Sequence, residues 1–225
     1  MNNKIKKLVI IAAFTSFVCI ISPISIYIGP IPISLSLFII LIVNGLFNKF
    51  EGLLITLLYI TIGIIGIPVF SSYTSGINII LGPTGGYIIG YVICSLVISL
   101  FTNLNNNSNV ILIISYIIGT MLCYICGITY YIYLMNISLI DAIIVGVFPF
   151  ILIDTIKISL AFIITIIFKN KLSYWFLLIK YFKPHYYKVM GFYTIILNII
   201  IKVYLYKYIL LYHKLKNKTN IRLNI

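Results

Sequence analysis

Six long apolar stretches fill the first 168 residues of this 225-residue chain, and they limit what it can fold into. Those 168 residues include five lysines and three acidic residues, and only 8% of the whole chain is charged, against roughly 25% in soluble domains. This composition excludes a water-soluble core. The sequence predicts an all-α, polytopic membrane protein, a six-transmembrane-helix bundle with re-entrant or irregular outer loops. The stretches cover residues 8–21, 35–47, 53–67, 87–101, 110–135 and 143–168.

Several of these stretches are shorter than the roughly 20 residues that a membrane span needs, so we expect their flanks to complete them. Pro149 predicts a kink near the outer end of the sixth stretch. The basic start followed by an apolar run resembles a signal peptide, but no small-residue cleavage pattern follows it. We therefore expect the first helix to be retained.

The distribution of lysines predicts the orientation of the bundle. The loops at residues 23–34, 68–82 and 135–142 contain no Lys or Arg. Lysines occur instead before the first stretch, between the second and third, and after the sixth: Lys4, Lys6, Lys7, Lys49, Lys169 and Lys171. With six spans all of these lie on one side, which predicts a multi-pass plasma-membrane protein with a cytoplasmic N-terminus.

The glycine- and proline-containing loops at residues 23–34 and 68–82 then face outward. Residues 82–87 read Gly-Pro-Thr-Gly-Gly-Tyr and open the fourth stretch, and residues 71–76 are small and polar. Irregular backbone at the edge of a membrane bundle is tolerated where it is buried in protein or lines a cavity. These loops are therefore where we expect a ligand site.

A pair of opposite charges lies within the sixth stretch. Asp154 and Lys157 are three residues apart, which places them on one helix face. A charge at this depth costs about 2.5–3.5 kcal/mol on the insertion scale and usually faces the bundle interior. The pair is either a purely structural ion pair or a polar group that points into a cavity. Glu51 and Asp141 lie at segment ends, where interfacial or capping roles are expected.

No motif for catalysis or metal binding stands out. Cys123-x-x-Cys126 has the spacing of a redox or metal pair, but on a membrane helix these cysteines are expected to be small apolar residues. Residues 1–168 contain no histidine, and an intramembrane enzyme would need paired acids or Ser with His. We expect no catalytic residues, no metal and no cofactor.

Four landmarks, in this order, resemble the BioY family of biotin-binding S-components of energy-coupling-factor (ECF) transporters. They are residues 30–35 (Pro-Ile-Pro-Ile-Ser-Leu), residues 63–70 (Gly-Ile-Ile-Gly-Ile-Pro-Val-Phe), residues 82–87, and Pro149-Phe150 followed by Asp154-x-x-Lys157 and Leu160-Ala161. The resemblance covers about residues 8–168. It implies a six-helix subunit with an outward-facing pocket for biotin, a shared transmembrane coupling protein and a pair of ABC-type ATPases. Some family members are thought to work without that module.

The resemblance also implies roles for individual residues. The substrate-binding set would be Asp154, Lys157, Gly82, Pro83, Thr84, Gly85, Gly86 and Tyr87. The outer loops would gate the pocket through Pro30, Pro32, Pro68, Phe70 and Gly76. Ala12 and Ser16 form a small-residue face on the first helix, suited either to docking the coupling protein or to packing within the bundle. A pocket for another vitamin on the same architecture is the alternative.

Residues 169–225 differ from the body, because they hold eleven of the sixteen basic residues and no acid. A seventh span at about residues 189–212 would place the final basic cluster outside, against the positive-inside rule. Two interpretations remain: a basic, aromatic-rich helix on the anionic inner leaflet, or a non-native extension. A nucleic-acid partner is not expected for so apolar a tail.

Overall fold

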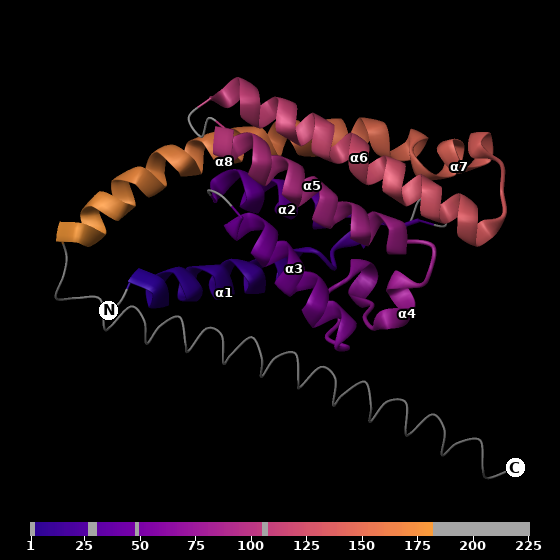
Figure 1. Cartoon of the computed structure of the whole chain (residues 1–225), viewed down its shortest axis with the longest axis horizontal. Helices are drawn as coiled ribbons and strands as arrows, with labels where there is room; N and C mark the ends of the chain where they lie inside the picture. The colour runs from indigo at the N-terminus through magenta and orange to yellow at the C-terminus, as the bar shows by residue number, and fades with distance from the viewer. Residues whose placement is uncertain (1–2, 27–30, 48–49, 105–107, 182–225) are drawn as a thin grey trace, which may run out of the picture. The chain divides into compact units, whose positions relative to one another are not determined.

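The computed structural model describes residues 3–26, 31–47, 50–104 and 108–181. Contacts within the chain separate two units, residues 1–171 and 172–225. The first unit is mostly helical (Figure 1), and its described residues include one two-stranded antiparallel sheet. Its elements in chain order are α1 (Asn3–Ile21), β1 (Ser25–Ile26), β2 (Ile33–Ser34), α2 (Ser36–Leu46), α3 (Glu51–Ile64), the 3-10 turn η1 (Ser71–Tyr73), α4 (Ile77–Ile80), α5 (Gly85–Leu104), α6 (Asn109–Met135), α7 (Leu139–Gly146) and α8 (Phe148–Tyr181).

Local capping residues set several helix ends. The Ser108 hydroxyl accepts a hydrogen bond from the Ile111 amide at the start of α6, and Asn136 ends that helix in the left-handed conformation. The Ser138 hydroxyl accepts from the Asp141 amide at the start of α7. These are the residue types that satisfy the free amides and carbonyls of helix termini.

Five of the six predicted apolar stretches correspond to single helices, and the sixth does not. The prediction of one helix over residues 143–168, kinked at Pro149, is wrong. The chain breaks at Val147 (φ −127°, ψ −49°), which separates α7 from α8. Pro149 lies in the first turn of α8, where its missing amide hydrogen leaves no intrahelical bond unmade.

Helix α2 forms the centre of the bundle. Nine of its residues are buried, from Ser36 and Leu37 through Ile39–Gly45. A helix that is apolar on every side is expected to be surrounded by protein. Helices α1, α3 and α5 all contact it, and α8 reaches it at Gly45, which lies against Thr165.

Small residues allow α5 and α6 to pack closely along their length. On α5 they are Gly86, Gly90 and Cys94, and on α6 they are Gly119, Cys123 and Gly127, each set spaced by four. A Cβ added at Gly90 would lie 2.9 Å from the Cys123 Cα, and one at Gly119 would lie 2.8 Å from the Cys94 Sγ. Cys123 therefore acts as a small packing residue at a close helix crossing.

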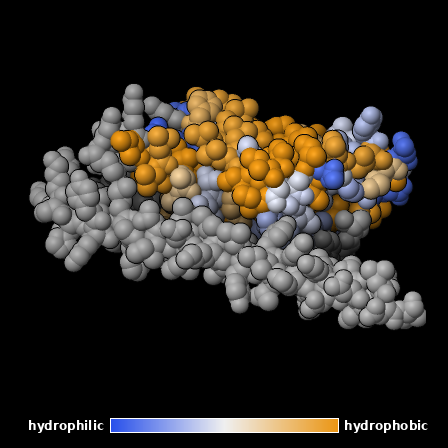
Figure 2. All heavy atoms as spheres, turned by 90° about the horizontal axis from the view of Figure 1, so that it is seen from below, coloured by the Kyte–Doolittle hydropathy of each residue, from blue (hydrophilic) through white to orange (hydrophobic). Residues whose placement is uncertain are grey.

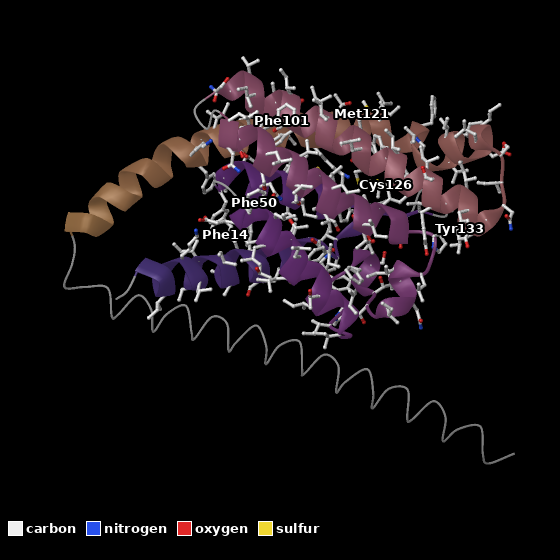
Figure 3. The ribbon with its side chains drawn as sticks, in the orientation of Figure 1. Phe14, Phe50, Phe101, Met121, Cys126 and Tyr133 are labelled. Atoms are coloured by element: carbon white, nitrogen blue, oxygen red, sulfur yellow. The ribbon has the colours of Figure 1, made fainter. Side chains whose placement is uncertain are left out.

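The flank of the bundle is apolar, as a lipid environment requires. Figure 2 shows one such face, largely hydrophobic, with hydrophilic residues concentrated toward its ends. Met121 and Tyr133 are exposed residues along α6 (Figure 3). Among the described residues, three helices are long and apolar enough to cross a membrane: α5, α6 and residues Phe148–Lys169 of α8. Lys7–Ile21, Ser36–Leu46 and Glu51–Ile64 are shorter apolar helices.

The first helix is fixed to the third at the basic end of the bundle. Lys7 Nζ lies 2.5 Å from Glu51 Oε1, in the first turn of α3. Glu51 thus occupies a helix N-terminus, where a negative charge is favoured. Asp141 occupies the equivalent position in α7 and accepts a hydrogen bond from the Ser138 hydroxyl at 2.7 Å.

Candidate binding site

A cavity of about 40 Å³ lies where the two predicted outer loops, residues 23–34 and 68–82, meet the bundle. Its wall combines aromatic and aliphatic side chains with a few polar ones. Residues from the first outer loop, α2, α3, the second outer loop, α5, α6 and α8 contribute: Ile31, Pro32, Ser34, Ser36, Leu37, Tyr59, Phe70, Ser71, Thr84, Tyr87, Ile88, Tyr91, Cys123, Tyr124, Phe150, Asp154 and Lys157. A mostly apolar pocket with a few convergent polar groups is typical of a small-molecule site.

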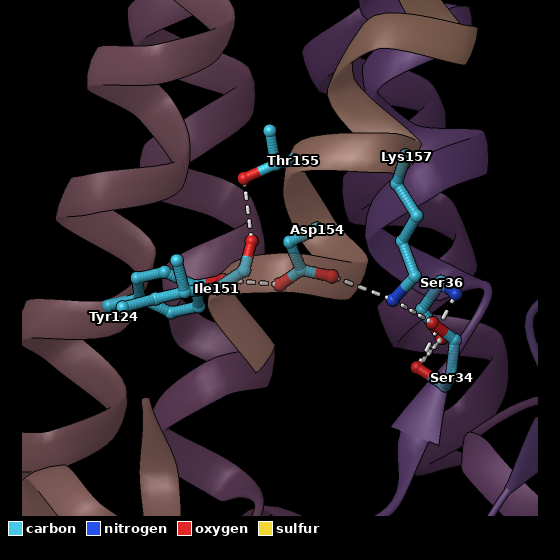
Figure 4. A network of polar contacts seen from close by, with 7 residues as sticks. All are labelled: Ser34, Ser36, Tyr124, Ile151, Asp154, Thr155 and Lys157. Carbon is cyan, nitrogen blue, oxygen red and sulfur yellow. Dashed lines mark hydrogen bonds and ion pairs between the residues drawn. The ribbon is translucent and has the colours of Figure 1, made fainter. Parts of the chain in front are cut away.

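Asp154 and Lys157 form the most polar part of this wall (Figure 4). Lys157 Nζ lies 2.8 Å from Asp154 Oδ1 and also donates to the Ser34 carbonyl at 2.8 Å. Tyr124 donates its hydroxyl hydrogen to Asp154 Oδ2 at 2.5 Å. Both charged residues are buried, at 4% and 7% exposure. The two opposite charges balance each other, and contacts from Tyr124 on α6 and Ser34 on β2 hold the pair in place.

The polar contacts continue from Lys157 into the start of α2. The Ser34 hydroxyl donates to the Ser36 hydroxyl at 3.0 Å, and Ser36 donates to the Ser22 carbonyl at 3.2 Å. Ser22 directly follows α1. A continuous chain of contacts thus joins α6, α8, β2, the start of α2 and the end of α1.

The glycine-rich segment contributes to the cavity through only two of its six residues. Thr84 and Tyr87 line it, whereas Gly82, Pro83, Gly85 and Gly86 do not. Three amides of the segment already make turn or helix bonds: Gly82 N to Ile79 O, Gly85 N to Gly82 O, and Tyr87 N to Thr84 O. These three amides therefore already have hydrogen-bond partners within the protein.

Close packing explains the two buried glycines of that segment. A Cβ at Gly85 would overlap the Ile80 carbonyl, and one at Gly86 would lie 2.8 Å from the Cys126 carbonyl on α6. These contacts fix the start of α5 and with it Tyr87. The Tyr87 hydroxyl donates to the Gly146 carbonyl at 2.8 Å, and its ring stacks on Phe150 with centroids 6.3 Å apart.

Of the predicted gating residues, Pro32 and Phe70 line the cavity, and Pro68 and Gly76 do not. Pro30 lies outside the described residues. Phe70 is 1% exposed and packs edge-to-face on Tyr59, with centroids 5.8 Å apart. Gly76, at φ +96°, donates its amide to the Gly63 carbonyl at 2.8 Å, which ties the loop to the end of α3. A residue with a Cβ would be strained there.

The two outer loops are bonded to each other. Ser25 and Ser72 share a hydrogen bond between hydroxyls at 2.7 Å, and the Ser72 amide donates to the Pro23 carbonyl at 2.9 Å. Ser72 and Tyr73 both have left-handed backbone angles, with φ of 58° and 60°. Residues other than glycine adopt this conformation at a cost in energy, so the contacts around Ser72 hold a strained turn above the cavity.

Ala12 is exposed on α1, and Ser16 is half-buried one turn later. The Ser16 hydroxyl donates to the Ala12 carbonyl at 3.0 Å, so its polar group is satisfied within the helix. Phe17, beside them, is 50% exposed. This side of α1 is therefore apolar and not covered by the described part of the bundle.

Sequence reasoning did not identify Tyr124, Tyr91 or Tyr59 as part of the site. A usable signal was present, since a tyrosine buried in a membrane helix needs a partner for its hydroxyl. Tyr87 and Tyr91 are four residues apart on α5, which places both on one face of that helix. Among the described residues no group of three or more potential metal ligands occurs, and the four cysteines are free.

An apolar helical bundle that encloses a mostly apolar cavity with a buried ion pair in its wall is typical of a membrane-embedded binding protein. More specifically, the chain belongs to the BioY family, whose model matches residues 1–174. This membership confirms the resemblance seen in the motifs. It also places the chain among transporters and not among enzymes.

Known relatives agree with this membership. The chain is 32% identical over 161 residues to the probable biotin transporter BioY of Pyrococcus horikoshii, covering 72% of this chain and 94% of that one. It is 30% identical over 168 residues to the biotin transporter BioY of Thermotoga maritima, covering 73% and 96%. A crystal structure of the S-component for biotin from an ECF-type ABC transporter superposes with a TM-score of 0.68 at 27% identity, covering 73% of this chain and 92% of that chain.

Proposed function

We propose that this protein takes up biotin, as the membrane-embedded substrate-binding component of an ECF-type transporter. Family membership and the structural similarity to an S-component for biotin support the assignment. The observation that carries it is the buried Asp154–Lys157 pair, held by Tyr124 in the wall of an otherwise apolar cavity. A polar pair at this depth is costly, which favours a functional role.

Biotin offers chemistry that matches this pair. Its ureido ring has two N–H donors and one carbonyl, its second ring and side chain are apolar, and its side chain ends in a carboxylate. The Asp154 carboxylate accepts from N–H groups, and the Lys157 ammonium donates to a carbonyl. Because the pair is neutral as a unit, the neutral ureido ring suits it better than the carboxylate, which would stand beside Asp154.

The remaining residues of the predicted site have distinct roles in this proposal. Thr84 and Tyr87 contact the ligand from the start of α5. Gly85 and Gly86 fix that helix start through close packing, and Gly82 and Pro83 form the turn before it. The apolar rings of Tyr59, Phe70 and Phe150 in the cavity wall suit the apolar part of biotin.

The outer loops act as a gate. The cavity of about 40 Å³ is much smaller than the roughly 300–1,000 Å³ of a typical ligand pocket. The ligand therefore requires a movement of its walls. Pro32 and Phe70 lie directly on the cavity, and Gly76 and Pro68 shape the loop behind Phe70. Pro30 completes the first loop.

The partner surface is assigned to the exposed side of α1 that carries Ala12 and Ser16. Small residues four apart permit close approach of another membrane helix, here that of the ECF coupling protein with its ABC-type ATPases. The N-terminus of α1 is cytoplasmic in this proposal, with α1, α2, α3, α5, α6 and α8 as the six spans. The pairing of Lys7 with Glu51 supports this, since it places a basic residue at the end of the bundle opposite the cavity.

The body of the protein is residues 1–168, and residues 169–225 are a basic, aromatic-rich tail. For the tail, a helix on the inner membrane surface and a non-native extension are the two proposals. A variant that lacks residues 182–225 distinguishes these two proposals when its biotin binding and membrane insertion are measured. A truncated protein with normal binding and expression favours the extension.

Biotin binding by the purified protein tests the function, and Asp154→Asn tests the site. The matched control is Asp141→Asn, the same chemical change at an exposed helix start. We expect tight binding by the wild type and Asp141→Asn, and at least about a ten-fold loss in Asp154→Asn, the range for a hydrogen bond to a charged group. A folded wild type that binds another vitamin and not biotin would overturn the substrate. Uptake without ATPase partners would show solitary transport.

A further inference from the structure

The charges available to the cavity are unusually few. Residues 8–168 contain only two basic side chains, Lys49 and Lys157, and no arginine or histidine. Lys49 lies outside the described residues. Among the described residues of the cavity wall, Lys157 is the one basic side chain and Asp154 the one acidic side chain.

The positive charge of Lys157 is already balanced by the carboxylate of Asp154. Its ammonium lies 2.8 Å from Asp154 Oδ1 and donates to the Ser34 carbonyl at the same distance. A ligand carboxylate at Lys157 would bring a second negative charge next to Asp154, in a buried site where repulsion is poorly screened. The carboxylate of a bound ligand therefore lies away from the pair.

The wall also offers neutral polar groups on elements other than α8. Thr84 precedes α5, and Ser71 opens η1 in the second outer loop. The outer loops at residues 23–34 and 68–82 contain no Lys, Arg or His. Among the described residues of the cavity wall, a carboxylate near Thr84 and Ser71 meets hydroxyls and the N-terminal end of a helix, and no basic side chain other than Lys157 lines the cavity.

We propose that the site recognises the ring system of biotin and tolerates loss of charge at its carboxylate, so that neutral amides of biotin are ligands of the same site. The inference rests on the proposed function. It extends the substrate class to molecules with an intact ureido ring whose carboxylate is joined to another group through an amide. An amide carbonyl accepts hydrogen bonds from the same hydroxyls as a carboxylate does.

The expected difference in affinity follows from the groups present. An exposed helix N-terminus favours a negative charge by about two- to five-fold. A charge-assisted hydrogen bond to a lysine or arginine would instead be worth about ten- to hundred-fold. The dissociation constants of biotin and its primary amide are therefore expected to agree within about five-fold.

Isothermal titration of the purified full chain with biotin and with its primary amide tests this. Affinities within about five-fold support the inference. A preference for free biotin of about thirty-fold or more would overturn it and leave the proposed function standing, because it would require a cation at the carboxylate. Binding of neither ligand by folded protein would overturn the proposed function, and the inference with it.

A variant that supplies the missing cation gives a second test. Thr84→Lys places an ammonium at the loop side of the cavity, and Thr84→Met adds similar length without charge. We expect Thr84→Lys to favour free biotin over the amide by about ten-fold or more, and Thr84→Met to show no such preference. Equal affinities in Thr84→Lys would overturn the placement of the carboxylate near Thr84.

Discussion

Removing the two members of the buried ion pair, singly and together, separates its structural role from its role in binding. The variants are Lys157→Met, Asp154→Asn and the double variant. Each single change leaves one buried charge without its counter-charge, which costs about 3–5 kcal/mol in the free energy of unfolding. The double variant leaves no charge at all.

The contacts in the structure determine how much free energy of unfolding the double variant still loses. The Ser34 carbonyl no longer receives the hydrogen bond from Lys157, and an unsatisfied buried acceptor costs about 1–3 kcal/mol. The side-chain amide that Asp154→Asn introduces still accepts from Tyr124 through its oxygen. We therefore expect a loss of about 1–3 kcal/mol in the double variant, against about 6–10 kcal/mol if the single losses simply added.

Unfolding in detergent with increasing dodecyl sulfate, followed by circular dichroism, measures these differences. Ile156→Met and Asp141→Asn are matched controls at exposed positions. Biotin titration of the same variants gives the second readout, and we expect binding to be weakened in all three. Additive stability losses would refute the coupling between Asp154 and Lys157. Wild-type biotin affinity in the stable double variant would show that the pair is structural alone.

Three further predictions follow from single contacts. Tyr124→Phe removes a hydrogen bond to a charged group and is expected to lower the free energy of unfolding by about 1.5–3 kcal/mol. The control Tyr133→Phe, at an exposed site, is expected to change it by less than about 0.5 kcal/mol. Equal effects of the two variants would contradict this prediction. Gly90→Leu is expected to separate α5 from α6 and to reduce the amount of folded monomer in size-exclusion chromatography. An unchanged elution profile would show that the two helices can accommodate the larger side chain. Phe70→Ala is expected to speed biotin dissociation about ten-fold or more in a radiolabel chase, and an unchanged rate would remove Phe70 from the gate.

Much of the fold follows from hydropathy alone. In a membrane every backbone polar group must be satisfied internally, so an apolar stretch bounded by polar residues becomes a helix. The break at Val147 escaped this reasoning because the residues on both sides of it are apolar. Pro149 indicated a disturbance but not its form, since a proline fits the first turn of a new helix as readily as it kinks an old one.

Of the candidate site, the charged residues were the part that the sequence could predict. Asp154 and Lys157 are conspicuous in an apolar stretch, and three-residue spacing placed them together. The glycines of residues 82–87 carry a less specific signal, because glycine serves close packing as well as ligand contact, and Gly85 and Gly86 are closely packed in the structure. Tyr124 is one tyrosine among nineteen, and only the tertiary structure brings its hydroxyl to Asp154.

The contacts around Lys157 also connect the proposed ligand site to the two outer loops. A ligand carbonyl that takes a hydrogen bond from Lys157 would share its ammonium with the Ser34 carbonyl, which lies in β2. Strand β2 pairs with β1 through Ser25, and Ser25 bonds to Ser72 in the second outer loop. A ligand at Lys157 would therefore be connected to both outer loops through hydrogen bonds that already exist. Ser72 is held in a left-handed conformation that its contacts must stabilise, so weakening those contacts favours a different loop conformation.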